Sequence, residues 1–263
     1  MNPILPALGL CALLLTLPVQ AAAPDPLVQG TEDHEAQILG WSADGKRFAM
    51  RLYLHPPFTS RAAPNPPPYC EGYVNHENHY FHGGLVWLAY ERGHLLDSFV
   101  ILAPDTCTPI PEAEQRLAAA KKKLAELGIS LEATGQELVP PVNTNTLAVD
   151  QGPHAPYTLE YEEHTTAQAP NSKSGNKRGT LEQSVYMQQG KARQKLLGRK
   201  VPYEYSAAMM GYLRTGLDRV WLSPSGSTMV VLGYERVGNM SGGRKSLRML
   251  GMLGWSGNAL KPL

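Results

Sequence analysis

Two stretches far apart in the chain share one pattern, and this pattern constrains the fold more than any other feature. Residues 38–54 read I-L-G-W-S-A-D-G-K-R-F-A-M-R-L-Y-L, and residues 220–235 read V-W-L-S-P-S-G-S-T-M-V-V-L-G-Y-E. In each stretch an apolar segment leads into a four-residue turn that ends in glycine, Gly45 or Gly226, and a second apolar segment follows. Glycine accepts the backbone angles of tight turns, and serine, aspartate and proline suit the other corners. The pattern therefore predicts two β-hairpins.

The residues after each turn predict how far each returning strand is buried. From Arg47 to Leu54, polar and apolar residues alternate, which is the period of a strand with one buried face. The segment Met229–Leu232 is apolar at every position, which is typical of a strand covered on both faces. We therefore expect the second hairpin to lie centrally in the molecule.

Further hairpins and a single helix complete the set of elements that we expect. Residues 84–102 are predicted to form a hairpin, and residues 180–201 another that turns at Gly190 and Lys191. Between them, residues 112–127 carry an apolar stripe at helical spacing opposite a run of lysines. The stripe consists of Leu117, Ala120, Leu124 and Leu127.

These elements predict one mainly β (α+β) domain over residues 24–263, in which antiparallel hairpins form a sandwich or a partial propeller and the helix at about 112–127 is inserted. Residues 55–83 are rich in proline and histidine, which predicts a long excursion from the sheet. Residues 165–179 are small, polar and without period, which predicts a flexible loop.

The first 23 residues predict export. Residues 4–19 are apolar and uncharged, and Ala21–Ala23 supplies the small residues after which a signal peptidase cuts. The apolar segment contains two prolines and is shorter than the ~20 residues that a membrane-spanning helix needs. We therefore expect a periplasmic or secreted protein with no transmembrane segment in the mature chain.

Removal of residues 1–23 leaves two cysteines, Cys70 and Cys107. In an oxidising compartment an even pair is most simply a disulfide, and the alternative is two free buried thiols. The loop that the bond closes has about 37 residues, which corresponds to roughly 3 to 4 kcal/mol in the chain-entropy model.

The order of these features resembles a family of predicted secreted bacterial proteins of unknown function. The resemblance rests on the signal peptide, the G-W-S-A-D-G-K-R-F-A strand, the Ala- and Lys-rich helix that ends in L-G-I, and the V-W-L-S-P-S-G hairpin. The W-S-x-D-G-K-R-x-A phrase is also similar to the strand-turn-strand repeats of propeller proteins of the periplasmic translocation-associated type. The resemblance implies export and a β-rich fold, and it assigns no catalytic residues.

The sharpest candidate for chemistry is a histidine cluster, His76, His79 and His82, with Cys70 nearby in the sequence. Imidazoles at this spacing can bind zinc or copper, so a transition metal is the one cofactor that the sequence suggests, and the alternative is no cofactor. Proline before the cluster and Gly83 after it favour a loop, in which such residues also form an ordinary hydrogen-bonded surface.

A second candidate is a basic face on the strand that follows Gly190. Its residues are Lys191, Arg193, Lys195 and Arg199. Such a face would bind an acidic envelope protein, an anionic polysaccharide or a lipid head group. The alternative is an edge strand that lysines protect against pairing with other chains.

The net charge of +1 gives no field that would attract nucleic acid, and the common nucleotide-binding and hydrolase motifs are absent from the sequence. We therefore assign no catalytic residues. The sequence favours a non-enzymatic binding or scaffold module of the bacterial cell envelope, and the alternative is a small metal-dependent enzyme that uses His76, His79 and His82.

Overall fold

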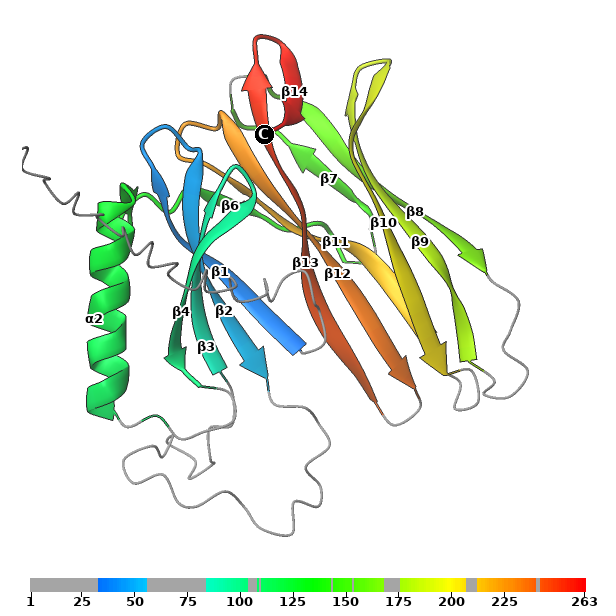
Figure 1. Ribbon diagram of the computed structural model, residues 1–263. Helices are drawn as coiled ribbons and strands as arrows, with labels where there is room; N and C mark the ends of the chain where they lie inside the picture. Colours follow the sequence, from blue (N-terminus) through cyan, green and yellow to red (C-terminus); the bar gives the residue numbers. More distant parts are fainter. Residues whose placement is uncertain are drawn as a thin grey trace, which may run out of the picture.

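The structure, a computed structural model, describes residues 33–55, 84–103, 108, 110–142, 144–152, 154–167, 176–206, 212–239 and 242–263. In this part of the chain the fold is mainly β, with three antiparallel sheets and one α-helix, as the sequence predicts (Figure 1). The predicted signal peptide and most of the excursion at residues 55–83 lie outside the described residues.

The three sheets are each built around a run of four strands that are consecutive in the chain. The first sheet contains β1 (Asp33–Ser42), β2 (Arg47–His55), β3 (Gly84–Glu91), β4 (His94–Leu102) and β5 (Ile129–Ser130), in the order β4-β3-β2-β1-β5. The outer sheet contains β7 (Thr146–Val149), β8 (Tyr157–Ala167), β9 (Asn176–Gln189) and β10 (Ala192–Ser206), in the order β10-β9-β8-β7. The middle sheet contains β6 (Gln136–Leu138), β11 (Tyr212–Leu222), β12 (Thr228–Asn239), β13 (Gly242–Ser256) and β14 (Ala259–Pro262), in the order β14-β13-β12-β11-β6.

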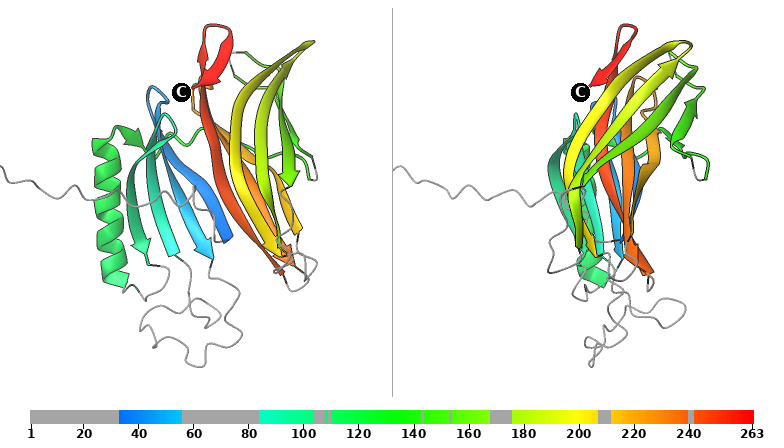
Figure 2. Two further views of the ribbon diagram at one scale, coloured as in Figure 1. Left: turned by 45° about the vertical axis from the view of Figure 1, so that its right-hand side comes forward. Right: turned by 90° about the vertical axis from the view of Figure 1, so that its right-hand side faces the viewer.

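The helix and the sheets form four layers, in the order helix, first sheet, middle sheet, outer sheet (Figures 1 and 2). Strand β12 of the middle sheet is apolar on both faces, and each face is buried against another sheet. Val230 and Leu232 pack against the first sheet, Met229 and Val231 pack against the outer sheet, and all four side chains are fully buried. The sequence prediction that this hairpin lies centrally is confirmed.

The order of the layers does not follow the order of the chain. The last run of strands, β11 to β14, lies between the first run and the second. In a propeller, consecutive blades are neighbours around a central axis. Of the two arrangements that the sequence leaves open, the layered sandwich therefore describes the molecule.

Helix α2 (Ile110–Glu126) covers the face of the first sheet that points away from the middle sheet. Ala120 and Leu124 are fully buried against that face, and Leu117 and Leu127 pack beside them. Gly128 has a φ of +72°, the left-handed conformation that ends many helices. The predicted helix and its apolar stripe are confirmed.

Strands extend further into residues 165–179 than the sequence predicts. Strand β8 continues to Ala167, β9 begins at Asn176, and Ala167 pairs in register with Gly179. Small polar residues have no strand period of their own, but pairing with a neighbouring strand overrides weak local preference.

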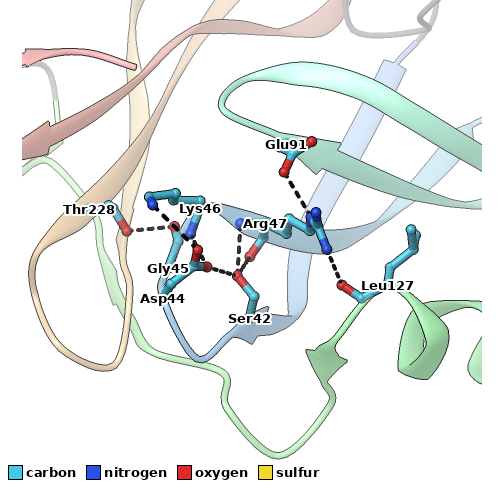
Figure 3. Close-up of polar contacts among 8 residues, drawn as sticks. All are labelled: Ser42, Asp44, Gly45, Lys46, Arg47, Glu91, Leu127 and Thr228. Carbon is cyan, nitrogen blue, oxygen red and sulfur yellow. Dashed lines mark hydrogen bonds and ion pairs between the residues drawn. The ribbon is translucent and has the colours of Figure 1, made fainter.

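The two turns of the repeated pattern have the same internal hydrogen bonds. The amide of Gly45 donates to the carbonyl of Ser42 at 2.9 Å, and the amide of Gly226 donates to that of Ser223 at 2.8 Å. Both glycines have a φ of +68°. The hydroxyl of Thr228 donates to the carbonyl of Gly45 at 2.8 Å and links the two turns (Figure 3). The repeated pattern thus holds the first sheet against the middle sheet.

Arg47, which follows the first turn, ties the first hairpin to the helix. Its Nε donates to Glu91 at 2.9 Å, and a terminal nitrogen of the guanidinium donates to the carbonyl of Leu127 at 3.0 Å (Figure 3). Leu127 directly follows the last helical residue, where carbonyls lack helical partners and positive charge is favourable. In this chain the D-G-K-R phrase therefore has a structural role.

Candidate functional site

Several residues that the sequence singles out fall outside the part of the chain that the structure describes. They are His76, His79, His82, Cys70 and Cys107. The metal site and the disulfide therefore stay predictions. Within the described ranges, no three His, Cys, Asp or Glu side chains are grouped so that they could hold a metal ion.

The four predicted basic residues lie on different parts of β10 and its turn. Strand β10 is the edge of the outer sheet. Arg193 and Lys195 lie on its outward face, and Lys191 is exposed in the turn before it. Arg199 pairs in register with buried Gln183, so it lies on the face towards the middle sheet. The four residues thus do not form one surface.

Glutamates neutralise much of the charge on the outward face. Arg193 Nε donates to Glu160 at 2.9 Å, a second guanidinium nitrogen bonds Glu162, and Lys195 donates to Glu182 at 3.3 Å. The hydrogen bond to Glu160 raises the pKa of Arg193, and the bond from Lys195 lowers the pKa of Glu182. Sequence reasoning did not find Glu160 and Glu162 as partners, because pairing with β9 brings β8 beside this part of the sheet.

A cleft of about 410 Å³ opens between β8 of the outer sheet and β11 of the middle sheet, and we call it the β8–β11 cleft. Its walls are residues 140–142, 144 and 145 after β6, residues 213–215, 217 and 218 of β11, Glu163 of β8 and Tyr234 of β12.

The cleft forms where two strands both lose their outer neighbour. Strand β6 pairs with β11 only at Val220–Leu222, and β7 pairs with β8 only at Tyr157–Glu160. Beyond these points β11 and β8 are sheet edges within the described structure, except that the amide of Tyr161 donates to the carbonyl of Asn145 at 2.7 Å. Pro140 and Pro141 follow the end of β6 and have no backbone N–H, so they cannot continue the pairing.

A chain of hydrogen bonds leads from the interior to the cleft. Gln183 Nε2 donates to the hydroxyl of Tyr161 at 3.0 Å, and that hydroxyl lies 2.7 Å from Thr215 Oγ1. Thr215 in turn donates to the carboxylate of Glu163. Since Thr215 gives its proton to Glu163, Tyr161 must be the donor to Thr215. The chain fixes the Glu163 carboxyl in the cleft.

Burial changes the acidity of both ionisable members of this chain. It raises the pKa of Tyr161 to about 12, so the phenol stays neutral and remains a donor. Partial burial also raises the pKa of Glu163. The Oε1 atom of Gln183 is buried and has no hydrogen-bond partner among the described atoms. Tyr161, Gln183 and Thr215 are therefore held away from water, which makes their interactions stronger, whereas the Glu163 side chain is exposed where the chain reaches the cleft.

The other carboxylate of the cleft is already neutralised. Asp218 is buried and forms ion pairs with Arg219 at 2.6 Å and with Lys245. Glu163 has no cationic partner within the described residues, and its one hydrogen bond there comes from Thr215. Among the described residues of the cleft, Glu163 is thus the carboxylate without a counter-charge.

An exposed apolar ridge borders the cleft. Val139 is 62% exposed and Val142 is 88% exposed, the highest values among the large apolar side chains of the described structure. Pro140 and Pro141 lie between them, and we call residues 139–142 the valine–proline ridge. Contiguous exposed apolar residues mark contact surfaces, and these four residues form one apolar run beside the cleft.

A larger hollow, of about 620 Å³, lies between residues 132–136, residues 151–152 and the turn at residues 222–226. Its hydroxyl groups already bond within the turn, since the Ser225 hydroxyl lies 3.2 Å from that of Ser223 and 2.7 Å from that of Ser227. Its other polar side chains, such as Glu132 and Gln151, are not ordered by a buried hydrogen-bond chain like the one behind Glu163, so the β8–β11 cleft is the stronger candidate site.

Sequence reasoning did not find Glu163, although the chain carries a signal for it. Tyr157, Leu159 and Tyr161 occupy alternate, inward positions of β8, and Glu163 is the next residue of the same series. A carboxylate in an inward series is costly unless it is paired. Thr215 had no comparable signal, because only the packing of two sheets brings it to Glu163.

Within the described residues no helix is both long and apolar enough to span a membrane. Comparisons of the whole chain with protein-family models, with curated proteins and with solved structures found no match.

Proposed function

We propose that this chain is an exported bacterial protein that binds another protein of the cell envelope and catalyses no reaction itself. The observation that carries the proposal is the valine–proline ridge beside the β8–β11 cleft. Burying two exposed valines against a partner gains about 25 cal/mol per Å² of apolar surface. The same side chains gain nothing in the isolated chain.

The charge pattern favours a protein partner over an anionic polysaccharide or a lipid head group. Arg193 and Lys195 on the outward face of β10 already pair with glutamates. These pairs reduce the positive field that an anionic polymer would require. In this proposal the lysines and arginines of β10 protect a sheet edge, and Pro202 on the same strand has the same effect.

Export rests on the predicted signal peptide, residues 1–23, and is consistent with a disulfide between Cys70 and Cys107. The second candidate function, a metal-dependent enzyme, rests on His76, His79 and His82. The metal content of the purified protein separates the two functions. A stoichiometric transition metal that is lost when His79 and His82 are replaced would favour the enzyme.

Site-specific photo-cross-linking in the producing bacterium tests the binding proposal. A benzophenone side chain at Val142 is expected to give an adduct with one envelope protein. The control is the same side chain at Lys200, which is exposed on the outward face of the outer sheet. No adduct at position 142, or the same adduct at both positions, would show that the ridge is not a binding surface.

A further inference from the structure

We propose that the partner binds as an extended segment that adds a strand to the open edge of β11 and places a basic side chain on Glu163. This inference rests on the proposed binding function and adds the chemical class of the partner. Strand addition to an exposed sheet edge is a common mode of peptide recognition, in which main-chain hydrogen bonds supply affinity and side-chain pockets supply specificity.

The backbone of β11 provides the first part of the argument. Strand β12 pairs with β11 from Tyr212 to Leu222, with a break in register at Asp218, and so occupies one side of the strand. On the other side β6 reaches only Val220–Leu222, and no other described strand pairs there. Residues 213–215, 217 and 218 of β11 line the cleft, and an open strand edge such as this one is a template for an added strand.

The prolines of the ridge explain why the chain does not close this edge itself. Continuation of β6 would cover β11, but Pro140 and Pro141 have no N–H to donate to it. The segment after β6 therefore lines the cleft instead of filling it. An incoming strand has its own N–H groups and can form the bonds that the prolines cannot.

The side chains around the cleft provide the second, independent part of the argument. An added strand directs alternate side chains towards the outer sheet, where Glu163 is held by Thr215. Since Asp218 is already paired with Arg219 and Lys245, Glu163 is the carboxylate that lacks a counter-charge among the described groups of the cleft. Partial burial destabilises its ionised form, and a lysine or arginine of the partner would reverse that effect.

The valine–proline ridge provides the apolar contact that such a segment needs. Val139 and Val142 are the most exposed large apolar side chains of the described structure; Val142 lines the cleft, and Val139 directly precedes Pro140, which also lines it. The preferred partner is thus an extended segment in which a basic residue alternates with apolar ones.

The experiment pans a library of random seven-residue peptides, displayed on phage, against the full-length exported chain. Enriched peptides are expected to contain one lysine or arginine flanked by β-branched or aromatic residues. Binding of a synthetic enriched peptide should weaken by about tenfold in Glu163→Gln, the scale of one charge-assisted hydrogen bond. The matched control is Glu162→Gln, the same change at the preceding residue, on the outward face beside Arg193.

Two further measurements test the strand itself. N-methylation of alternate amides of the synthetic peptide should abolish binding, because it removes the donors that pair with β11. Hydrogen exchange should show new protection at residues 213–219 when the unmodified peptide is bound. Peptides without a basic preference, equal binding to both glutamine variants, or protection at another strand would each overturn the inference.

These outcomes are separable from failure of the proposed function. An adduct at Val142 together with no effect of Glu163→Gln would keep the binding function and reject the basic, strand-adding partner. Absence of both an adduct and any enriched peptide would reject both.

Discussion

At the scale of single residues, the decisive position is Glu163. It follows three buried inward residues of β8, and it reaches the cleft because Thr215, Tyr161 and Gln183 form an ordered chain behind it. Although the Glu163 side chain is exposed, its carboxylate loses part of its water and gains no described cation, so ionisation costs some folding free energy. Such a cost is retained in a protein when the group serves a partner, and this is consistent with the binding proposal.

Glu163→Gln is expected to raise the free energy of unfolding at about pH 7. The pKa of Glu163 in the folded chain lies above its ordinary value of 4.5. The stability linked to this group is therefore complete below pH 4.5 and is lost as pH rises through the folded-state pKa. The glutamine keeps the oxygen that accepts from Thr215 and removes the ionisation.

Denaturant unfolding at neutral pH and below pH 4.5 measures this effect. The free energy of unfolding of Glu163→Gln should exceed that of the unchanged chain at neutral pH and should equal it in acid. Glu162→Gln is the control, and it should show no such gain because Glu162 lies outside the cleft and pairs with Arg193. A lower free energy of unfolding for Glu163→Gln at neutral pH would show that the environment of Glu163 does not destabilise its ionised form.

At the scale of elements, the two glycine turns determine how the first and middle sheets meet. A Cβ atom on Gly45 would lie 2.6 Å from the hydroxyl oxygen of Thr228, closer than side chains pack. Gly190, in the turn between β9 and β10, has a similar positive φ of +58° but no atoms within 4 Å of such a Cβ. Both turns therefore need glycine for its backbone angles, but only Gly45 also needs it because a side chain would collide with a neighbour.

Gly190→Ala is expected to cost about 1 kcal/mol, the strain of a left-handed alanine. Gly45→Ala should cost about 2 to 3 kcal/mol, since it adds displacement of Thr228 and loss of its hydrogen bond to the same strain. The free energies of unfolding of the two variants measure this difference. Equal costs would mean that the contact between the two turns contributes nothing.

At the scale of the whole molecule, the middle sheet joins two apolar cores. One core lies between it and the first sheet and includes Trp221, Val230 and Leu232. The other lies between it and the outer sheet and includes Val231 and Leu253. Since neighbouring residues of one strand belong to both cores, neither sheet pair can separate without exposing the shared sheet.

We therefore expect the three sheets to unfold in one cooperative transition. Leu232→Ala perturbs the core with the first sheet, and Leu253→Ala perturbs the core with the outer sheet; both side chains are fully buried. Each should cost about 2 to 5 kcal/mol. Both should shift the same transition, observed by calorimetry and by tryptophan fluorescence. Two separate transitions, each shifted by one variant, would show independent domains.

Much of the local structure could be predicted because its causes are local. The turns at Gly45 and Gly226, the stripe of α2 and the two-faced burial of Met229–Leu232 each follow from residue types at fixed spacing. The basic face that the sequence predicts on β10 is different. The sequence shows the spacing of Arg193 and Lys195, but their partners Glu160 and Glu162 come from another strand.

The sequence by itself determined that this chain forms glycine-cornered hairpins and one amphipathic helix, because turn angles and side-chain periods depend on neighbouring residues. Only the tertiary structure decided that strands β11 to β14 lie between the first and outer sheets. It also decided that β8 and β11 both lose their neighbouring strands beside the cleft. The cleft with Glu163 results from that placement, since it depends on which apolar faces bury one another, and these faces come from segments far apart in the chain.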